Sequence, residues 1–350
     1  MTAVELPTTM PAAVYREKGV LEVVDVETPA VGPHEVLLEV SHCGVCGSDI
    51  HFVLEGWGTP DAIEGHEYTG VVAAVGSEVT RWTLGQPVVA GPSRRCGECE
   101  PCRLGRPSLC LNREDVGTGG YQGAFARFSL AHEDEVLALP DGLTLRQAAL
   151  AEPLAVALHG ITQARVESHH RVIVFGAGPI GALTIAALAA KGVTDLTVVE
   201  PSAPRQGLAT AVGATRVVTP DDLDEPGWHP GHLVEAPYDR AIECSGHRSA
   251  MEQALGQLGR MGRLVLVGAG IDPPRFDANR ITLNELEITG AFVYDANGFE
   301  DALALLPRLP IDQLIEPVDV ALPDLLTAME RLAAGELAGK VMVTPGGTDV

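Results

Sequence analysis

The chain has 350 residues and carries 24 Lys plus Arg against 47 Asp plus Glu, which gives a formal net charge of −23. A surface this acidic repels phosphate backbones and anionic lipid, so we expect neither nucleic acid nor membrane as a partner. Hydrophobic residues make up 46% of the chain, a composition typical of a globular protein that argues against a largely disordered one. At this length two domains are expected rather than one.

The hydropathy pattern and the cysteines indicate a cytoplasmic protein. The longest apolar stretch, residues 180–190, is too short to cross a bilayer. The N-terminal segment lacks the basic start and the continuous apolar run of a secretory signal. Six of the seven cysteines lie between Cys43 and Cys110, a distribution expected for metal ligands in a reducing compartment rather than for disulfides.

The pattern of predicted elements changes near residue 155. Before it, short β segments such as EVLLEVSHCG, YTGVVAAVGSEV and QPVVAGPS are interrupted by glycine and proline, which predicts an irregular, mostly β domain. After it, the strand RVIVFG, a helix over residues 178–191 and the strand LTVVE form a βαβ unit. Further strands are predicted at 216–218, 238–246, 262–270 and 286–294. We therefore predict an α/β protein with a doubly wound parallel sheet.

The tail contains two amphipathic helical patterns, FEDALALLPRL and LPDLLTAMERLAAGEL, followed by the strand-like KVMVTP. We expect this segment to return to the first domain. The predicted organisation is a β-rich domain over residues 1–154, a nucleotide-binding domain over 155–292 and a C-terminal return over 293–350.

A glycine-rich turn marks the predicted nucleotide site. Gly176, Gly178 and Gly181 follow a strand and open a helix, the context in which this spacing binds a dinucleotide. The first glycine makes the turn, the second lets the pyrophosphate approach the backbone, and the third allows close packing of helix on strand. We expect Pro179 and Ile180, and Val267 at the end of a later strand, to contribute to the same site.

Glu200 ends the strand LTVVE, in the place expected for the acid that binds the adenosine ribose. A carboxylate there repels the additional phosphate of NADP, so we expect NAD as the cofactor. Arg205 follows closely and keeps NADP as the alternative, because an inward-turned guanidinium binds a 2′-phosphate.

Four cysteines predict a structural metal site. Cys96, Cys99, Cys102 and Cys110 lie in a stretch interrupted by glycine and proline, so four thiols can converge. An iron–sulfur cluster takes the same ligands, but a closed four-thiol loop without another redox signature favours zinc.

A second group of residues suits an open metal site. Cys46 and His66 offer a thiolate and an imidazole, and Glu67 and Glu152 offer carboxylates. One thiolate plus one glutamate neutralises Zn²⁺, so we expect the two carboxylates to alternate between ligating the metal and holding its water. Cys43 could compete with Cys46, with a buried spare thiol as the alternative. Asp49 is expected to orient His66 by accepting its second N–H.

The motifs GVCGSD, GHE, the four-cysteine loop, AEPLAVALH and GAGPIG occur in this order over nearly the whole chain. With them the sequence resembles the zinc-dependent medium-chain dehydrogenase/reductase family. The resemblance implies a GroES-like catalytic domain with an inserted Rossmann domain, and two zinc ions per chain, one catalytic and one structural. Liver and yeast alcohol dehydrogenases usually carry a cysteine where this chain has Glu152, so it looks more like the polyol, butanediol and threonine dehydrogenase branch.

The resemblance also implies a reaction. Zinc lowers the pKa of the substrate hydroxyl, and a hydride passes from the carbinol carbon to the nicotinamide. In the family, residues similar to Ser48 and His51 take the hydroxyl proton and pass it to solvent, beside the carboxylate corresponding to Glu67. The expected substrate is a small alcohol or its ketone.

Alternatives remain for the substrate, the direction and the assembly. A biosynthetic carbonyl reductase uses the same site in reverse, and a non-catalytic binding protein could share the fold, whereas zinc-free quinone oxidoreductases lack these ligands. Trp57, Phe125 and residues 292–295 are candidates for the substrate pocket, with core packing or subunit contact as the alternative. The apolar segment ITLNELEITGAFVY at the sheet edge predicts a homodimer or homotetramer.

Overall fold

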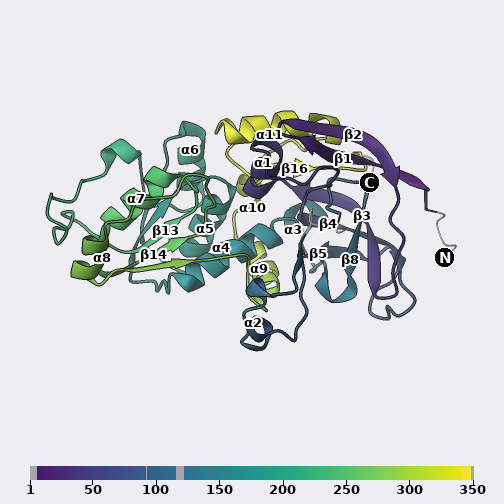
Figure 1. Ribbon diagram of the computed structural model, residues 1–350, viewed down its shortest axis with the longest axis horizontal. Helices are drawn as coiled ribbons and strands as arrows, with labels where there is room; N and C mark the ends of the chain where they lie inside the picture. Colours follow the sequence, from purple (N-terminus) through teal and green to yellow (C-terminus); the bar gives the residue numbers. More distant parts are fainter. Residues whose placement is uncertain (1–5, 92, 116–121, 348–350) are drawn as a thin grey trace. The chain divides into compact units, whose positions relative to one another are not determined.

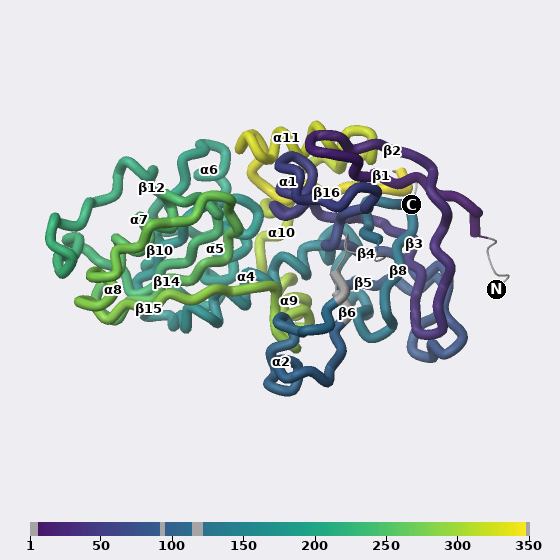
Figure 2. The backbone as a smooth tube through the Cα atoms, in the orientation of Figure 1, coloured from purple at the N-terminus to yellow at the C-terminus, as the bar shows by residue number. Residues whose placement is uncertain are grey.

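A computed structural model describes residues 6–91, 93–115 and 122–347 of the chain. These residues form two compact units, shown in Figures 1 and 2. Unit 1 lies within Met1–Glu152, Ile315–Ala334 and Lys340–Val350, and unit 2 comprises Pro153–Leu314 and Gly335–Gly339. None of the helices in the described ranges is long and apolar enough to span a membrane.

Unit 1 is built on antiparallel strands. The hairpin of β1 (Thr9–Glu17) and β2 (Val20–Glu27) stands beside a sheet with the order β16-β3-β4-β5-β9, in which β8 also pairs with β3. These strands are β3 (Glu35–Gly44), β4 (Glu67–Val75), β5 (Pro87–Ala90), β8 (Phe128–His132), β9 (Val136–Ala138) and β16 (Met342–Val343). Val36, Leu37 and Leu38 are fully buried, so β3 anchors the core of this unit.

The remaining elements of unit 1 are short. They are α1 (Gly47–Leu54), β6 (Ser93–Arg94), α2 (Glu100–Arg103), β7 (Glu114–Asp115), α3 (Leu145–Ala148) and α11 (Leu325–Ala333). Although they lie far apart in the sequence, α11 and α1 are neighbours in the structure (Figure 1). The strand β16 pairs antiparallel with the end of β3, so the C-terminal segment completes the sheet that begins near residue 35.

Unit 2 contains a six-stranded parallel sheet in the order β12-β11-β10-β13-β14-β15. Its strands are β10 (Arg171–Phe175), β11 (Asp195–Val199), β12 (Arg216–Val218), β13 (Tyr238–Glu243), β14 (Leu258–Leu266) and β15 (Glu287–Gly290). The helices are α4 (Ala151–Gln163, beginning in unit 1), α5 (Pro179–Ala190), α6 (Ala203–Ala211), α7 (Arg248–Gly256), α8 (Ala278–Asn284), α9 (Gly298–Leu305) and α10 (Ile311–Leu314). The predicted doubly wound α/β fold is confirmed.

Several sequence expectations differ from the structure in unit 2. The strand predicted over residues 262–270 is β14 and spans Leu258–Leu266, and β13 ends at Glu243 rather than at residue 246. The strand predicted over residues 286–294 ends at Gly290, and Val293 has a left-handed φ of 54°, which a regular strand does not accommodate. Residues 293–314, predicted as part of the C-terminal return, lie in unit 2. Packing explains this, since α10 at the end of the segment contacts α5 and α6 of unit 2.

Candidate active site

Helix α1 begins at the predicted metal ligand Cys46, which occupies its N-cap. The backbone N–H of Cys46 donates to the Asp49 carboxylate over 2.8 Å, so the acidic residue in the first turn holds the cap in place. The helix therefore projects the Cys46 thiol from a fixed backbone position.

The other two nearby ligand candidates come from the start of β4. Ligand atoms of Cys46, His66 and Glu67 all lie within 4.8 Å of one another. Thiolate, imidazole and carboxylate are a donor set that Zn²⁺ accepts, and three protein ligands leave a coordination position open. The residues present thus fit a catalytic zinc. Gly44 leaves space beside them, because a Cβ at this position would displace Glu67 Oε2.

His66 lies between two predicted partners. Its Nδ1 is 3.5 Å from Asp49 Oδ1, and its Nε2 is 3.5 Å from Ser48 Oγ. Burial lowers the pKa of His66, but the charges of Asp49 and Cys46 outweigh it and raise the pKa well above the ordinary value. An imidazole that attracts a proton so strongly also attracts a cation in its place. Asp49 thus stands where a carboxylate would orient the ring.

Lys340 was not anticipated from the sequence. Its Nζ donates to Glu67 Oε1 over 2.7 Å and to the carbonyl oxygen of Val45 over 3.1 Å, and its side chain is 1% exposed. Burial lowers the pKa of Lys340, but the charges of Glu67 and Cys46 raise it by more, so the ammonium keeps its charge. Glu67 Oε2 has no hydrogen-bond partner among the described residues and is available to a metal.

Glu152 lies in the first turn of α4 and is 5% exposed. Burial raises its pKa to about 7; Glu67 and Asp49 also raise it, while His66 and Lys340 lower it. Glu152 is near these groups but does not belong to the tight cluster of Cys46, His66 and Glu67.

Lys340 changes the charge balance expected from the sequence. The Cys46 thiolate and the carboxylates of Glu67, Glu152 and Asp49 would supply four negative charges, against three positive charges from Zn²⁺ and the Lys340 ammonium. Lys340 therefore offsets one carboxylate beside the metal, and one negative charge is left in excess when both glutamates are ionised.

The predicted proton-relay residue His51 also lies on α1. Its Nδ1 is 2.6 Å from Glu55 Oε2, and its ring stacks on Trp57 with a centroid distance of 5.1 Å. Trp57 is half exposed, whereas Phe125 is fully buried and would collide with a Cβ on Gly65. Of these two pocket candidates, Phe125 is a core residue.

The four predicted structural ligands converge in the loop around α2. Ligand atoms of Cys96, Cys99, Cys102 and Cys110 all lie within 4.8 Å of one another. The N–H groups of Cys99 and Leu111 donate to the thiols of Cys96 and Cys99. Hydrogen bonds from the backbone amides of Glu98 and Cys99 lower the pKa of Cys96 to about 6. The four thiols fit a tetrahedral zinc.

In unit 2 the glycine turn joins β10 to α5. Gly176 has a φ of 88°, which favours glycine, and a Cβ on Gly181 would collide with the Gly176 carbonyl oxygen. Gly178 is the N-cap of α5, with Pro179 and Ile180 opening the helix, so the positive end of the helix dipole faces the turn. This arrangement fits a dinucleotide pyrophosphate.

Glu200 follows β11 and is 3% exposed. Its Oε2 accepts from the N–H of Ala177 over 2.7 Å, and its Oε1 accepts from the N–H of Ser202 over 2.8 Å. The carboxylate therefore braces the glycine turn. The Arg205 side chain donates to the carbonyl oxygen of Leu337 and would lie 3.9 Å from a Cβ on Gly178. Val267 follows β14, and its N–H donates to the Glu243 carbonyl oxygen.

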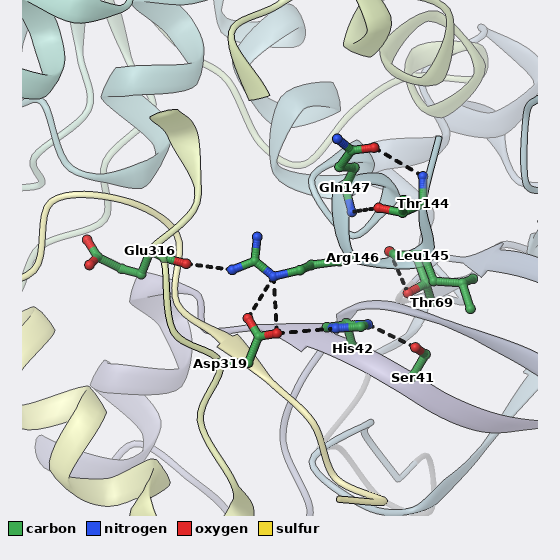
Figure 3. Close-up of polar contacts among 9 residues, drawn as sticks. All are labelled: Ser41, His42, Thr69, Thr144, Leu145, Arg146, Gln147, Glu316 and Asp319. Atoms are coloured by element: carbon green, nitrogen blue, oxygen red, sulfur yellow. Dashed lines mark hydrogen bonds and ion pairs between the residues drawn. The ribbon is translucent and has the colours of Figure 1, made fainter. Parts of the chain in front are cut away.

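A polar cluster ties the segment before β16 to the rest of unit 1 (Figure 3). From α3, Arg146 Nε donates to Asp319 Oδ1 over 2.8 Å, and its Nη2 donates to the Glu316 carbonyl oxygen over 2.5 Å. His42 Nε2 lies 3.5 Å from Asp319 Oδ2. The N–H of Glu316 in turn donates to the Lys340 carbonyl oxygen, so this cluster helps to hold the segment that contains Lys340.

Comparison with known proteins gives the class of the chain. Two family descriptions match it: "Alcohol dehydrogenase GroES-like domain" over residues 32–141 and "Zinc-binding dehydrogenase" over residues 179–308. A sorbitol dehydrogenase of Bacillus subtilis is 30% identical over 348 residues, which cover 97% of this chain and 98% of that protein. The chain belongs to the zinc-dependent medium-chain dehydrogenase/reductase family and is an oxidoreductase.

Solved structures agree with this assignment. The 2R,3R-butanediol dehydrogenase of Bacillus subtilis has a TM-score of 0.85 and 29% identity, covering 96% of this chain and 100% of that one. The acetophenone reductase of Geotrichum candidum in complex with NAD has a TM-score of 0.86 and 26% identity, covering 99% and 100%.

Proposed function

We propose that the protein is a zinc-dependent, NAD-linked dehydrogenase that interconverts a secondary alcohol, diol or polyol and its ketone. The observation that carries this proposal is the donor set in unit 1. Cys46, His66 and Glu67 converge within 4.8 Å, and the buried Lys340 ammonium offsets the charge of the Glu67 carboxylate. The glycine turn of unit 2 supplies the cradle for the dinucleotide.

The relatives narrow the substrate class. The sorbitol and butanediol dehydrogenases, as their names state, act on a polyol and on a vicinal diol. This chain has Glu152 where liver and yeast alcohol dehydrogenases usually carry a cysteine. Both points support a diol or polyol rather than a simple primary alcohol.

Each site residue has a separate role in the proposed reaction. Cys46, His66 and Glu67 would hold the zinc, which when bound lowers the pKa of the substrate hydroxyl. Asp49 orients His66. Ser48 accepts the hydroxyl proton and His51 conducts it toward solvent, while Glu152 holds a second carboxylate near the metal ligands. Gly176, Gly178 and Gly181 leave room for the nicotinamide dinucleotide.

For the cofactor we favour NAD over NADP. Glu200 places a carboxylate next to the glycine turn, where it repels a 2′-phosphate. Arg205 Nε donates to the Leu337 carbonyl oxygen, but its guanidinium lies beside Gly178 of the glycine turn, so NADP stays the alternative. Glu200→Ala is expected to lower the ratio of kcat/KM for NAD⁺ to that for NADP⁺ at least tenfold, with Glu225→Ala in an exposed loop as the control.

We further propose a second, structural zinc on Cys96, Cys99, Cys102 and Cys110. The strand β15 supports a homodimer or homotetramer, since it lies at the edge of the sheet within the described part of the chain and could pair there with a second copy. The cysteines of the chain are all free, which supports a cytoplasmic location.

The test is NADH formation by the zinc-replete protein with diols, polyols, amino alcohols and secondary alcohols, with NADP⁺ in parallel and metal content determined on the same sample. We expect turnover of a diol or polyol with NAD⁺ and two zinc ions per chain. Cys46→Ser should lose turnover and one zinc ion. Absence of turnover in both reaction directions, with two zinc ions present per chain, would refute the proposed function.

A further inference from the structure

We propose that Glu55 is a positioning residue for proton transfer: its carboxylate holds His51 in the tautomer that receives a proton and stabilises the imidazolium that results. This inference rests on the proposed function, because the proton to be moved comes from the oxidised alcohol. The inference adds the Glu55 carboxylate to the proposed proton-transfer path that runs from Ser48 to His51.

The first step is the arrangement of side chains on α1. Ser48, His51 and Glu55 are three and then four residues apart, so they lie on one face of the helix. This stripe starts beside the metal ligands, since Ser48 Oγ is 3.5 Å from His66 Nε2. It ends at the C-cap, where the Glu55 side chain is 30% exposed. The helix thus places a proton-carrying or charged group on each turn between the ligands and water.

The second step concerns the imidazole. His51 Nδ1 lies 2.6 Å from Glu55 Oε2, and a carboxylate only accepts hydrogen bonds. The proton of the neutral ring is therefore on Nδ1, and Nε2 is the basic nitrogen. Trp57 stacks on the ring with an interplanar angle of 21° and limits its rotation. His51 is fixed in both tautomer and orientation, as a proton acceptor needs to be.

Helix stability does not account for this pair. A carboxylate at the C-terminal end of a helix faces the negative end of the helix dipole and is disfavoured there. A pair at positions i and i+4 is also weaker when the basic residue comes first. Glu55 therefore occupies a position that lowers the stability of the helix, and its carboxylate contacts His51. The pair is better explained by its effect on His51.

The proton transfers follow from these positions. Ser48 Oγ takes the proton of the substrate hydroxyl as its own proton moves to His51 Nε2, and no bond to carbon changes in this step. His51 becomes an imidazolium whose Nδ1–H remains bonded to the Glu55 carboxylate. Water then removes the Nε2 proton of the imidazolium, which restores the neutral ring with its Nδ1–H bonded to Glu55.

A spectroscopic experiment tests the tautomer without any substrate. The zinc-loaded protein is labelled with ¹⁵N-histidine, and the His51 signals are assigned among the 11 histidines by their loss in His51→Gln. We expect the Nδ1–H form in the wild type and a shift toward Nε2–H in Glu55→Ala. Glu133→Ala, which removes the acceptor of His34 at 2.9 Å elsewhere in unit 1, should leave the His51 signals unchanged.

A kinetic experiment tests the consequence, with 2,3-butanediol and NAD⁺ as the first probes. Glu55→Ala should lower kcat about tenfold, a part of the effect of a complete acid–base catalyst. KM and zinc content should not change, and added imidazole should restore most of the rate. Glu55→Gln, which can accept the bond but has no charge, should fall between Glu55→Ala and the wild type.

The outcomes separate the two proposals. A wild-type His51 in the Nε2–H form, or an unchanged spectrum in Glu55→Ala, overturns the inference even if no substrate is turned over. A fully active Glu55→Ala that does not respond to imidazole overturns it as well. Absence of turnover by the wild type in both directions would instead count against the proposed function, and the tautomer experiment would still decide the role of Glu55.

Discussion

The buried pair of Lys340 and Glu67 makes a strong prediction about stability. Their charges are 2.7 Å apart and both side chains are at most 1% exposed. At an effective dielectric constant of about 20 the attraction is roughly 6 kcal/mol, and desolvation of the two ions offsets part of it. Lys340→Met leaves Glu67 as an unbalanced buried charge, so we expect metal-free protein to lose about 3–5 kcal/mol of stability.

Urea unfolding of the metal-free protein measures this loss. The buried Trp82 reports on unit 1, whereas Trp228 is 91% exposed and changes little on unfolding. Lys18→Met, at an exposed position of unit 1, is the control. The double variant Lys340→Met/Glu67→Gln should recover much of the loss, because position 67 then carries no buried charge that has lost its partner. A loss below about 1 kcal/mol in Lys340→Met would refute the reasoning.

Three further predictions concern pH, metal and the polar cluster. Burial raises the pKa of Glu152 from 4.5 to about 7, so between these pH values the folded metal-free protein binds more protons than the unfolded chain. Its stability should therefore fall as the pH rises from about 4.5 to about 7. Glu152→Gln should flatten the dependence of the urea midpoint on pH. Cys99→Ser should remove one of two zinc ions and lower the thermal midpoint, whereas Cys244→Ser should retain both by metal analysis. Arg146→Met removes the bonds to Asp319 and Glu316 and should cost about 2–3 kcal/mol in urea, while Arg81→Met at an exposed pair should cost little.

The sequence predicted those parts of the molecule whose signals are local. The strand, glycine turn and helix around Gly176 are contiguous, so their backbone requirements are visible in the order of residues. The four cysteines also lie within one short loop, so their spacing as metal ligands is visible in the sequence. The doubly wound sheet followed from the repeated alternation of strands and helices.

What the sequence could not predict depends on distant residues. Lys340 and Glu67 are 273 positions apart, and a lysine next to an apolar strand is usually solvent-exposed. The bond of Arg146 to Asp319 likewise spans 173 positions. The early end of β15 depends on the left-handed backbone at Val293, which the apolar pattern does not reveal. One missed residue had a local signal, since Glu55 follows His51 at the spacing of one helical turn.

The pairing of Lys340 with Glu67 also bears on biosynthesis. The ribosome makes the ligand-bearing segments of unit 1 early, but Lys340 and β16 follow only after unit 2 has been made. Until then the partner of Glu67 is missing, whereas the four-cysteine loop needs only its own short segment. On the nascent chain the proposed zinc loop is therefore complete before the pair of Lys340 and Glu67. The proposed catalytic centre therefore gains its buried lysine among the last steps of synthesis.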